Sequence, residues 1–218
     1  MTSESTIATN QASIHQRVAT YYAGKLREHG PTPRGVDWRD RESQEIRFDA
    51  LLQIADVAGA SVIELGCGYG ALFGYIRRSG LDLSYTGYDI AQQMVDAARK
   101  TYPDAEFARL DAGALPQRRA DYCVASGIFN IRFDIPDDVW LDYIFTTTDL
   151  MAAITDRGFA FNCLTTFSDH DRQEPRLYYA DPGEMLNRCI ARYGRRASLT
   201  HGRPPYEFTV LVRHDQHS

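Results

Sequence analysis

The chain has 218 residues, of which 44% are hydrophobic and 24% are charged, and this composition is typical of one globular domain with a full core. Its formal net charge of −5 argues against a nucleic-acid partner, because such partners are bound largely through Lys and Arg side chains that neutralise phosphates. The first residues are polar and no apolar run is long enough to span a membrane, so we expect a cytoplasmic protein with no membrane partner. The four cysteines form no C-x-x-C pair, so we expect buried thiols and no metal site.

The N-terminal part of the chain predicts two helices separated by an ordered cover. Apolar residues spaced along 12–29 indicate one helix, and a similar pattern along 43–57 indicates a second. Between them, 31–41 combines prolines, arginines and a tryptophan, a composition that suits an ordered lid better than a flexible linker. We therefore expect 1–57 to form a helical cap on a core that spans 58–218.

The most informative segment is 62–70, which reads V-I-E-L-G-C-G-Y-G. Its apolar residues predict a buried strand, and its alternating glycines predict a tight turn at which the backbone can take positive φ and approach a ligand closely. Two further predicted strands, 83–89 and 105–111, each end in Asp. Strands alternate with helices, which predicts a parallel sheet with right-handed crossovers and places the three strand ends at one edge.

This pattern resembles the class I S-adenosylmethionine-dependent methyltransferases from about residue 46 to the C-terminus. In that family an E/D-x-G-x-G-x-G turn cradles the methionine part of the cofactor. An acid after the second strand binds both ribose hydroxyls, and an acid after the third contacts the adenine amine. The resemblance implies S-adenosylmethionine as cofactor and S-adenosylhomocysteine as product. It assigns the methionine part to Glu64, Gly66, Gly68, Ser126 and Gly127, the ribose to Asp89 beside Ile90, and the adenine to Asp111 beside Ala112.

Two side chains of the predicted cap are further candidates for cofactor contact. Tyr22 matches N-terminal tyrosines that close over the cofactor in several family members, although core packing explains it equally well. Arg47 directly precedes Phe48, which lies on the buried side of the second predicted helix. The Arg47 side chain can point toward the cofactor carboxylate, with a surface ion pair as the alternative.

The glycine turn leaves two other functions open. Gly66, Gly68 and Ala71 also satisfy the G-x-G-x-x-G/A fingerprint of nicotinamide and flavin enzymes, with an acid about twenty residues further on. Glu64 would repel a pyrophosphate, however, and Asp111 is not part of that fingerprint, so both favour a sulfonium cofactor without phosphates. The other alternative is a protein that binds S-adenosylmethionine but transfers no methyl group.

The remaining elements complete the expected fold class. Strands are predicted at 121–127 and 158–166, and a terminal pair at 197–201 and 206–213, with the helix 140–155 covering the sheet. The expected fold is a Rossmann-like three-layer α/β/α sandwich. Its sheet has seven strands and is mostly parallel, with the last strand antiparallel. We expect a monomer or a homodimer.

Ligands of open α/β sheets bind outside the carboxyl ends of the strands, and this rule selects the acceptor candidates. Members of the family that methylate base or glutamine amines carry [D/N/S]-P-P-[Y/F/W] after the fourth strand, where this chain has S-G-I-F at 126–129. We therefore expect the acceptor to be an oxygen or nitrogen of a small polar metabolite, and arginines near the lid suit one that bears a carboxylate. The candidates for catalysis are Asn130, His170 and His201, the histidines because imidazole titrates near neutral pH. The candidates for acceptor binding are Arg34, Trp38, Phe129, Tyr178, Tyr179 and Arg203.

Overall fold

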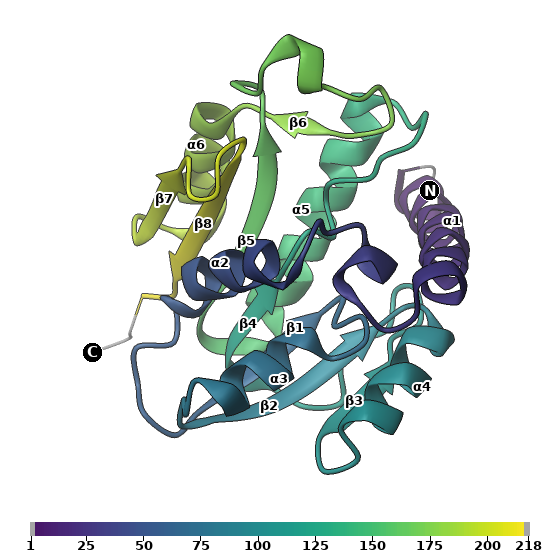
Figure 1. The fold of residues 1–218 in the computed structure, drawn as a ribbon. Helices are drawn as coiled ribbons and strands as arrows, with labels where there is room; N and C mark the ends of the chain where they lie inside the picture. The colour runs from purple at the N-terminus through teal and green to yellow at the C-terminus, as the bar shows by residue number, and fades with distance from the viewer. Residues whose placement is uncertain (1–2, 216–218) are drawn as a thin grey trace.

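The structure, a computed structural model, describes residues 3–215 and shows a central sheet between two layers of helices (Figure 1). The helices are α1 (Ser3–His29), α2 (Arg41–Leu52), α3 (Ala71–Arg78), α4 (Gln92–Thr101), α5 (Asp137–Ala153) and α6 (Pro182–Tyr193), with short 3-10 turns η1 (Pro33–Val36) and η2 (His170–Arg172). The strands are β1 (Ala60–Leu65), β2 (Leu83–Asp89), β3 (Glu106–Arg109), β4 (Ala120–Ala125), β5 (Thr155–Thr165), β6 (Tyr179–Ala180), β7 (Ala197–His201) and β8 (Glu207–Arg213).

The sheet has the strand order β3-β2-β1-β4-β5-β8-β7, with β6 paired to β5 outside this path. Strands β1 to β5 are parallel, whereas β8 runs antiparallel to both β5 and β7. The predicted fold class is therefore confirmed. The sheet has eight strands and not seven, because the two-residue β6 joins β5.

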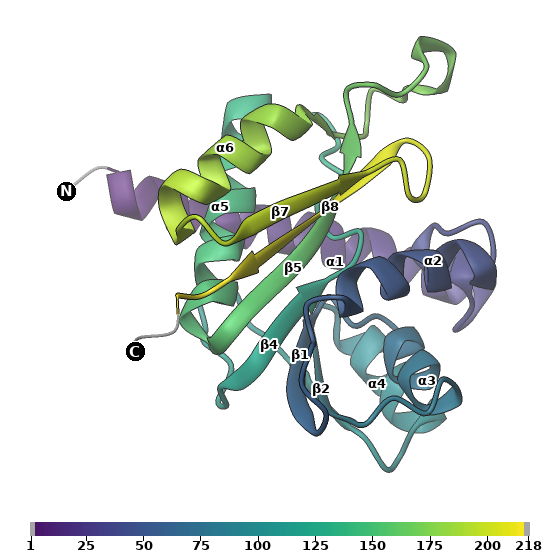
Figure 2. The ribbon, with the colours of Figure 1, turned by 90° about the vertical axis from the view of Figure 1, so that its left-hand side faces the viewer.

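Helices cover both faces of the sheet, as Figure 2 shows from the side, and the buried apolar side chains form two clusters. On one face α2, α3 and α4 contribute the buried side chains of Leu51, Leu72 and Val95. On the other face α5 contributes Ile144, and α1 adds Ile14. Burial of these faces on the sheet stabilises the three-layer arrangement through the hydrophobic effect.

Two helices differ from the sequence-based expectation, and both begin at an N-cap aspartate. Helix α2 begins at Arg41 because Asp40 and Ser43 form a capping box, and it ends at Leu52, earlier than predicted. Helix α6 was not predicted, although its start has a clear signal: the Asp181 side chain accepts a hydrogen bond from the Glu184 amide at 2.7 Å.

One connection of the parallel sheet lacks the usual helix. Helices α3, α4 and α5 follow β1, β2 and β4, but β3 leads to β4 through 110–119 without one. Helix α1 packs next to α4 in this part of the structure. Among residues 3–215, no helix is both long and apolar enough to cross a membrane. The four cysteines are buried free thiols, as predicted.

Candidate functional site

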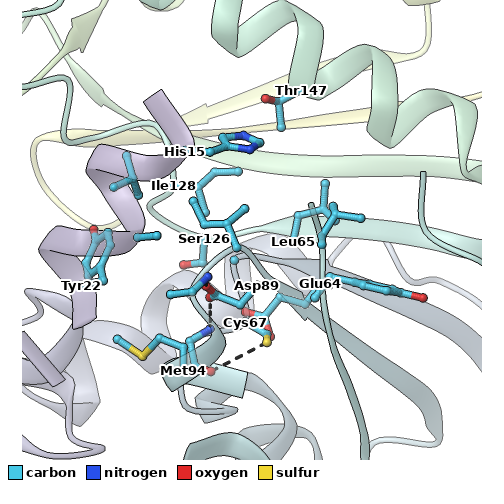
Figure 3. Close-up of a pocket in the computed structure, with 18 of the residues that line it drawn as sticks. His15, Tyr22, Glu64, Leu65, Cys67, Asp89, Met94, Ser126, Ile128 and Thr147 are labelled. Atoms are coloured by element: carbon cyan, nitrogen blue, oxygen red, sulfur yellow. Dashed lines mark hydrogen bonds between the residues drawn. The ribbon is translucent and has the colours of Figure 1, made fainter. Parts of the chain in front are cut away.

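A cavity of about 480 Å³ lies at the carboxyl ends of β1 and β2, between α1 and α5 (Figure 3). This is the edge at which open α/β sheets bind ligands. Its volume falls within the usual range for small-molecule sites, which is about 300–1,000 Å³. The cavity walls come from the glycine turn, the ends of β2 and β4, the segment after β3, and the two helices.

The glycine turn after β1 is folded back onto the end of β2. The amides of Gly66 and Cys67 both donate to the carbonyl oxygen of Tyr88, at 2.7 and 3.0 Å. Gly66 and Gly68 have φ values of 75° and 53°, which side chains other than glycine rarely adopt. A Cβ atom on Gly66 would lie 2.3 Å from the Ile128 side chain, so the turn also needs glycine for space.

Asp89 at the end of β2 is buried and fixes the other side of this turn. Its Oδ2 accepts a hydrogen bond from the Gly68 amide and its Oδ1 accepts one from the Ala91 amide, both at 2.8 Å. Burial raises the pKa of Asp89 to about 6, although these amide bonds oppose the shift. A carboxylate offers about four acceptor positions, so both oxygens can still bind hydroxyl groups in the cavity.

Glu64 is a second buried carboxyl group in the cavity wall. The Tyr85 hydroxyl donates to its Oε2, and burial raises the pKa of Glu64 to about 8. No Lys or Arg side chain lines the cavity within the part of the chain that the structure describes. The cavity therefore suits a ligand with positive charge, because such a ligand would stabilise the ionised forms of two buried carboxyl groups that have no cationic partner there.

Nine of the predicted cofactor residues line this cavity together: Tyr22, Glu64, Gly66, Gly68, Asp89, Ile90, Asp111, Ser126 and Gly127. Asp111 lies at the exposed edge, where it pairs with Arg109 at 2.6 Å. The Ser126 hydroxyl is buried without a hydrogen-bond partner. Ala112 lies outside the lining, next to Asp111.

Arg47 also lies outside the lining, in a buried network that surrounds the end of β4. Its Nε donates to both carboxylate oxygens of Glu207 at 2.9 Å, and its guanidinium stacks over Trp38 at 4.0 Å from the ring centroid. Asn162 donates to Glu207 at 2.7 Å and accepts from the Gly127 amide at 2.7 Å. The structure thus places Arg47 in a buried ion pair, away from the cavity and from the surface.

Of the residues predicted for catalysis or acceptor binding, only Trp38 lines the cavity. The others lie elsewhere: Arg34, Phe129, Asn130, His170, Tyr178, Tyr179, His201 and Arg203. The side chains of His170 and His201 are exposed, and His201 is hydrogen-bonded to the Thr165 hydroxyl at 3.0 Å.

The segment after β5 explains why the residues after β4 are covered. The amides of Arg132 and Phe133 donate to the Arg176 carbonyl oxygen at 3.0 and 2.9 Å, and the Tyr178 amide donates to the Asn130 carbonyl oxygen at 2.8 Å. Through these hydrogen bonds the segment 174–179 covers the segment 130–133. The Asn130 side chain is buried and its Oδ1 has no partner, and the Phe129 ring is buried in the core against Tyr143 and Phe161.

Sequence reasoning identified Tyr22 but missed the other cavity-facing side chains of α1 and α5. His15 and Val18 line the cavity from the same stripe of α1 as Tyr22, and Tyr143 and Thr147 line it from α5. Figure 3 shows the His15 ring projecting from α1 toward Thr147. The spacing of three, four and seven residues along α1 was a readable signal, but it predicts a face and not what that face meets.

His15 is partly buried and its Nδ1 atom has no hydrogen-bond partner. Its ring makes an edge-to-face contact with Tyr143, with 5.7 Å between ring centroids. Burial lowers the pKa of His15, which favours the neutral imidazole. Within residues 3–215 no group of three His, Cys, Asp or Glu side chains is placed to hold a metal ion.

Glu64 gives the cofactor-free protein a pH-dependent stability. The unfolded chain binds this proton only below its ordinary pKa of 4.5, whereas the folded protein holds it up to about pH 8. The free energy of unfolding should therefore fall as the pH rises from about 5 to about 8, by at most roughly 1.4 kcal/mol per pH unit. Glu64→Gln should flatten this slope and raise the stability at pH 8, as measured by urea unfolding. The exposed Glu42→Gln is the control, and a slope that is equal in all three proteins would contradict the assignment.

The comparisons with known proteins agree with this site. A methyltransferase-domain family model matches residues 62–148, which include the glycine turn and Asp89. Rv1506c of Mycobacterium tuberculosis, a protein named as a methyltransferase, is 44% identical over 153 residues, which are 70% of this chain and 92% of that protein. A fatty-acid O-methyltransferase of Mycolicibacterium smegmatis is 38% identical over 64 residues, which are 28% of this chain and 23% of that protein.

Solved structures share the fold at low sequence identity. DhpI in complex with S-adenosylmethionine superimposes with a TM-score of 0.61 at 18% identity, covering 93% of this chain and 98% of that one. Magnesium protoporphyrin IX methyltransferase from Synechocystis with bound S-adenosylhomocysteine gives 0.58 at 15% identity, covering 80% and 83%. With a relative this similar over nearly its whole length, the chain belongs to the class I S-adenosylmethionine-dependent methyltransferases, whose cofactor is S-adenosylmethionine, and the nicotinamide alternative is set aside.

Proposed function

We propose that this enzyme transfers the methyl group of S-adenosylmethionine to an oxygen or nitrogen atom of a small metabolite inside the cavity between the glycine turn and α1. The observation that carries this proposal is the continuity of the site. One cavity contains the glycine turn and Asp89 at one end and the side chains of α1 and α5 at the other.

The cofactor position follows from the charges and hydrogen-bonding groups of the lining. We place the ribose hydroxyls on Asp89 and the methionine part along Gly66 and Gly68, beside Ser126 with its unpaired hydroxyl. Charge-assisted hydrogen bonds from a diol to a carboxylate are the stronger kind. The sulfonium carries a positive charge, and Glu64 supplies a buried acidic group in the same wall.

Bound S-adenosylmethionine supplies an activated methyl group, so the protein mainly needs to align the acceptor and exclude water. Trp38 and Tyr22 line the cavity on the side of the cap, where they can shield it from solvent. Trp38 is held in place by Arg47, which stacks on its ring. The Trp38 ring also lies against Gly127, where an added Cβ would meet it at 2.5 Å.

We propose an acceptor that is uncharged where it contacts the protein. The described lining contains no Lys or Arg, so a carboxylate-bearing acceptor, as the sequence predicted, finds no cation there. Arg34 and Arg203 are exposed and lie outside the cavity.

The cytoplasmic location and the monomeric or dimeric state stay predictions from the sequence.

We also propose that the part of the predicted 1–57 cap that precedes α2 closes on the bound ligands, whereas α2 itself stays packed on the sheet. A cluster that we call the cap clasp joins α1, η1 and the segment after β5. Asp37 pairs with Lys25 at 2.9 Å and accepts the Tyr21 hydroxyl, while Arg176 donates to the Tyr21 oxygen at 2.7 Å. Because the clasp is partly exposed, it can open at modest cost in free energy.

Asp89→Ala should weaken binding of S-adenosylmethionine by roughly 2 kcal/mol, about 30-fold, because both ribose hydroxyls lose a charged partner. Isothermal titration calorimetry measures this, with circular dichroism to confirm folding. Asp96→Ala, an exposed carboxylate on α4, is the matched control and should bind normally. Unchanged affinity of Asp89→Ala would place the ribose elsewhere.

A screen with methyl-labelled S-adenosylmethionine over pooled metabolites tests the reaction. We expect the wild-type enzyme to label oxygen or nitrogen atoms of neutral metabolites. Gly68→Val should label none, because Gly68 has positive φ and its Cβ would approach Val36 to 3.3 Å in the cofactor turn. Labelling only of carbon or sulfur, or of strongly anionic metabolites, would contradict the proposed acceptor.

Closure of the cap predicts a change in backbone protection. S-adenosylhomocysteine should slow amide hydrogen exchange in the part of 12–47 that precedes α2 in the wild-type protein. In Asp37→Ala, exchange in this range should be about five-fold faster, because a clasp of this kind contributes about 1 kcal/mol. Arg27→Ala, at the exposed end of α1, is the control. Hydrogen exchange that responds neither to S-adenosylhomocysteine nor to Asp37→Ala would contradict closure of the cap.

A further inference from the structure

The cavity continues beyond the glycine turn into a space between α1 and α5. We call it the α1–α5 chamber and define it by the lining residues His15, Val18, Leu110, Tyr143, Thr147 and Leu150. It lies beside the connection from β3 to β4, which has no helix, on the sheet face that α5 covers. Val18, Leu110 and Leu150 belong to the apolar surface on this face, which makes most of the chamber wall hydrophobic.

Two polar groups face each other within this apolar wall. The Nδ1 atom of His15 is shielded from solvent and has no partner, which is unfavourable unless a ligand or a water molecule satisfies it. The Thr147 hydroxyl donates to the Tyr143 carbonyl oxygen at 2.9 Å, and the Tyr143 hydroxyl is also within hydrogen-bonding reach of the Thr147 side chain. Figure 3 shows His15 and Thr147 approaching from α1 and α5, with Ile128 below them.

The charges around the chamber exclude an anionic ligand. Lys and Arg are absent from the lining that the structure describes, and Asp149, at the edge, already pairs with Arg192 and accepts the Tyr193 hydroxyl at 2.9 Å. A carboxylate or phosphate would lose its hydration here and gain no cation. A neutral hydroxyl is complementary to His15, because it can donate to or accept from either tautomer of an uncharged imidazole.

We infer that the α1–α5 chamber is the acceptor subsite, and that it takes a neutral molecule with an apolar body whose hydroxyl group is held by His15. This inference rests on the proposed function and names its class of substrate. The apolar body packs against Val18, Leu110 and Leu150. His15 fixes the orientation of the hydroxyl in the same cavity that holds the methyl donor.

Small probes test the chamber without turnover. On protein saturated with S-adenosylhomocysteine, calorimetry should show that 4-butylphenol binds at least about ten-fold more tightly than 4-butylbenzoate, because the anion is desolvated without a partner. Val18→Trp should weaken 4-butylphenol binding at least about ten-fold by filling the chamber, and leave the affinity for S-adenosylhomocysteine within about two-fold. Gln16→Trp, on the exposed side of α1, is the matched control and should change neither affinity.

Variants at His15 separate a hydrogen bond from packing. His15→Leu should weaken 4-butylphenol binding about five-fold and leave butylbenzene unaffected, because one hydrogen bond is lost. His15→Asn, which can place its amide near the Nδ1 position, should restore most of the affinity for the phenol. If Val18→Trp does not fold, Leu150→Trp fills the chamber from the opposite wall and serves the same test.

Two results would overturn the inference. Affinity for 4-butylphenol that changes in neither Val18→Trp nor Leu150→Trp would place the probe elsewhere. A parallel loss of affinity for S-adenosylhomocysteine in His15→Leu would assign His15 to the cofactor. Because these titrations need no methyl transfer, their failure is distinct from a negative metabolite screen.

Discussion

The hydrogen bond between the Asp89 carboxylate and the Gly68 amide is the contact on which the site depends. The parallel register of β1 and β2 sets Leu65 beside Tyr88, so the turn after β1 and the end of β2 meet at one edge of the sheet. Asp89 then ties the turn to that edge, while the Tyr88 carbonyl oxygen accepts two amides of the turn. The same carboxylate that shapes the turn is thereby presented to the cavity, so folding and cofactor recognition share one group.

A second constraint joins the cap to the core through buried polar contacts. Arg47 of α2 reaches Glu207 of β8, and Glu207 is linked through Asn162 to the Gly127 amide at the end of β4. Breaking such a pair by removing one partner leaves a buried charge and typically costs about 3–5 kcal/mol. The network therefore couples the position of Trp38, which stacks on Arg47, to the loop that borders the cofactor site.

The sequence predicts the parts of this protein that depend on local pattern. The glycine turn, Asp89 and the parallel strands follow from residues close together in the chain, and the structure confirms the fold class that they indicate. The partner of Arg47 could not be predicted, because Glu207 lies 160 residues away and their pairing depends on β8 inserting next to β5.

The residues that line the cavity on the acceptor side also depend on contacts between distant parts of the chain. The rule that ligands bind at strand ends selected His170 and His201, but 174–179 folds over the segment after β4, and both histidines lie outside the cavity. The cavity instead borders the connection from β3 to β4, which has no helix, and α1 supplies His15 to its wall. A periodic pattern identifies the faces of α1, but the cavity that one face lines is a property of the whole sheet.

The most direct test of this account is a crystal structure of the protein with S-adenosylhomocysteine. We expect both ribose hydroxyls within hydrogen-bonding distance of the Asp89 carboxylate, and the α1–α5 chamber beside His15 free of the cofactor. A structure in which the ribose contacts other residues, or in which the adenine fills the space between His15 and Thr147, would contradict it.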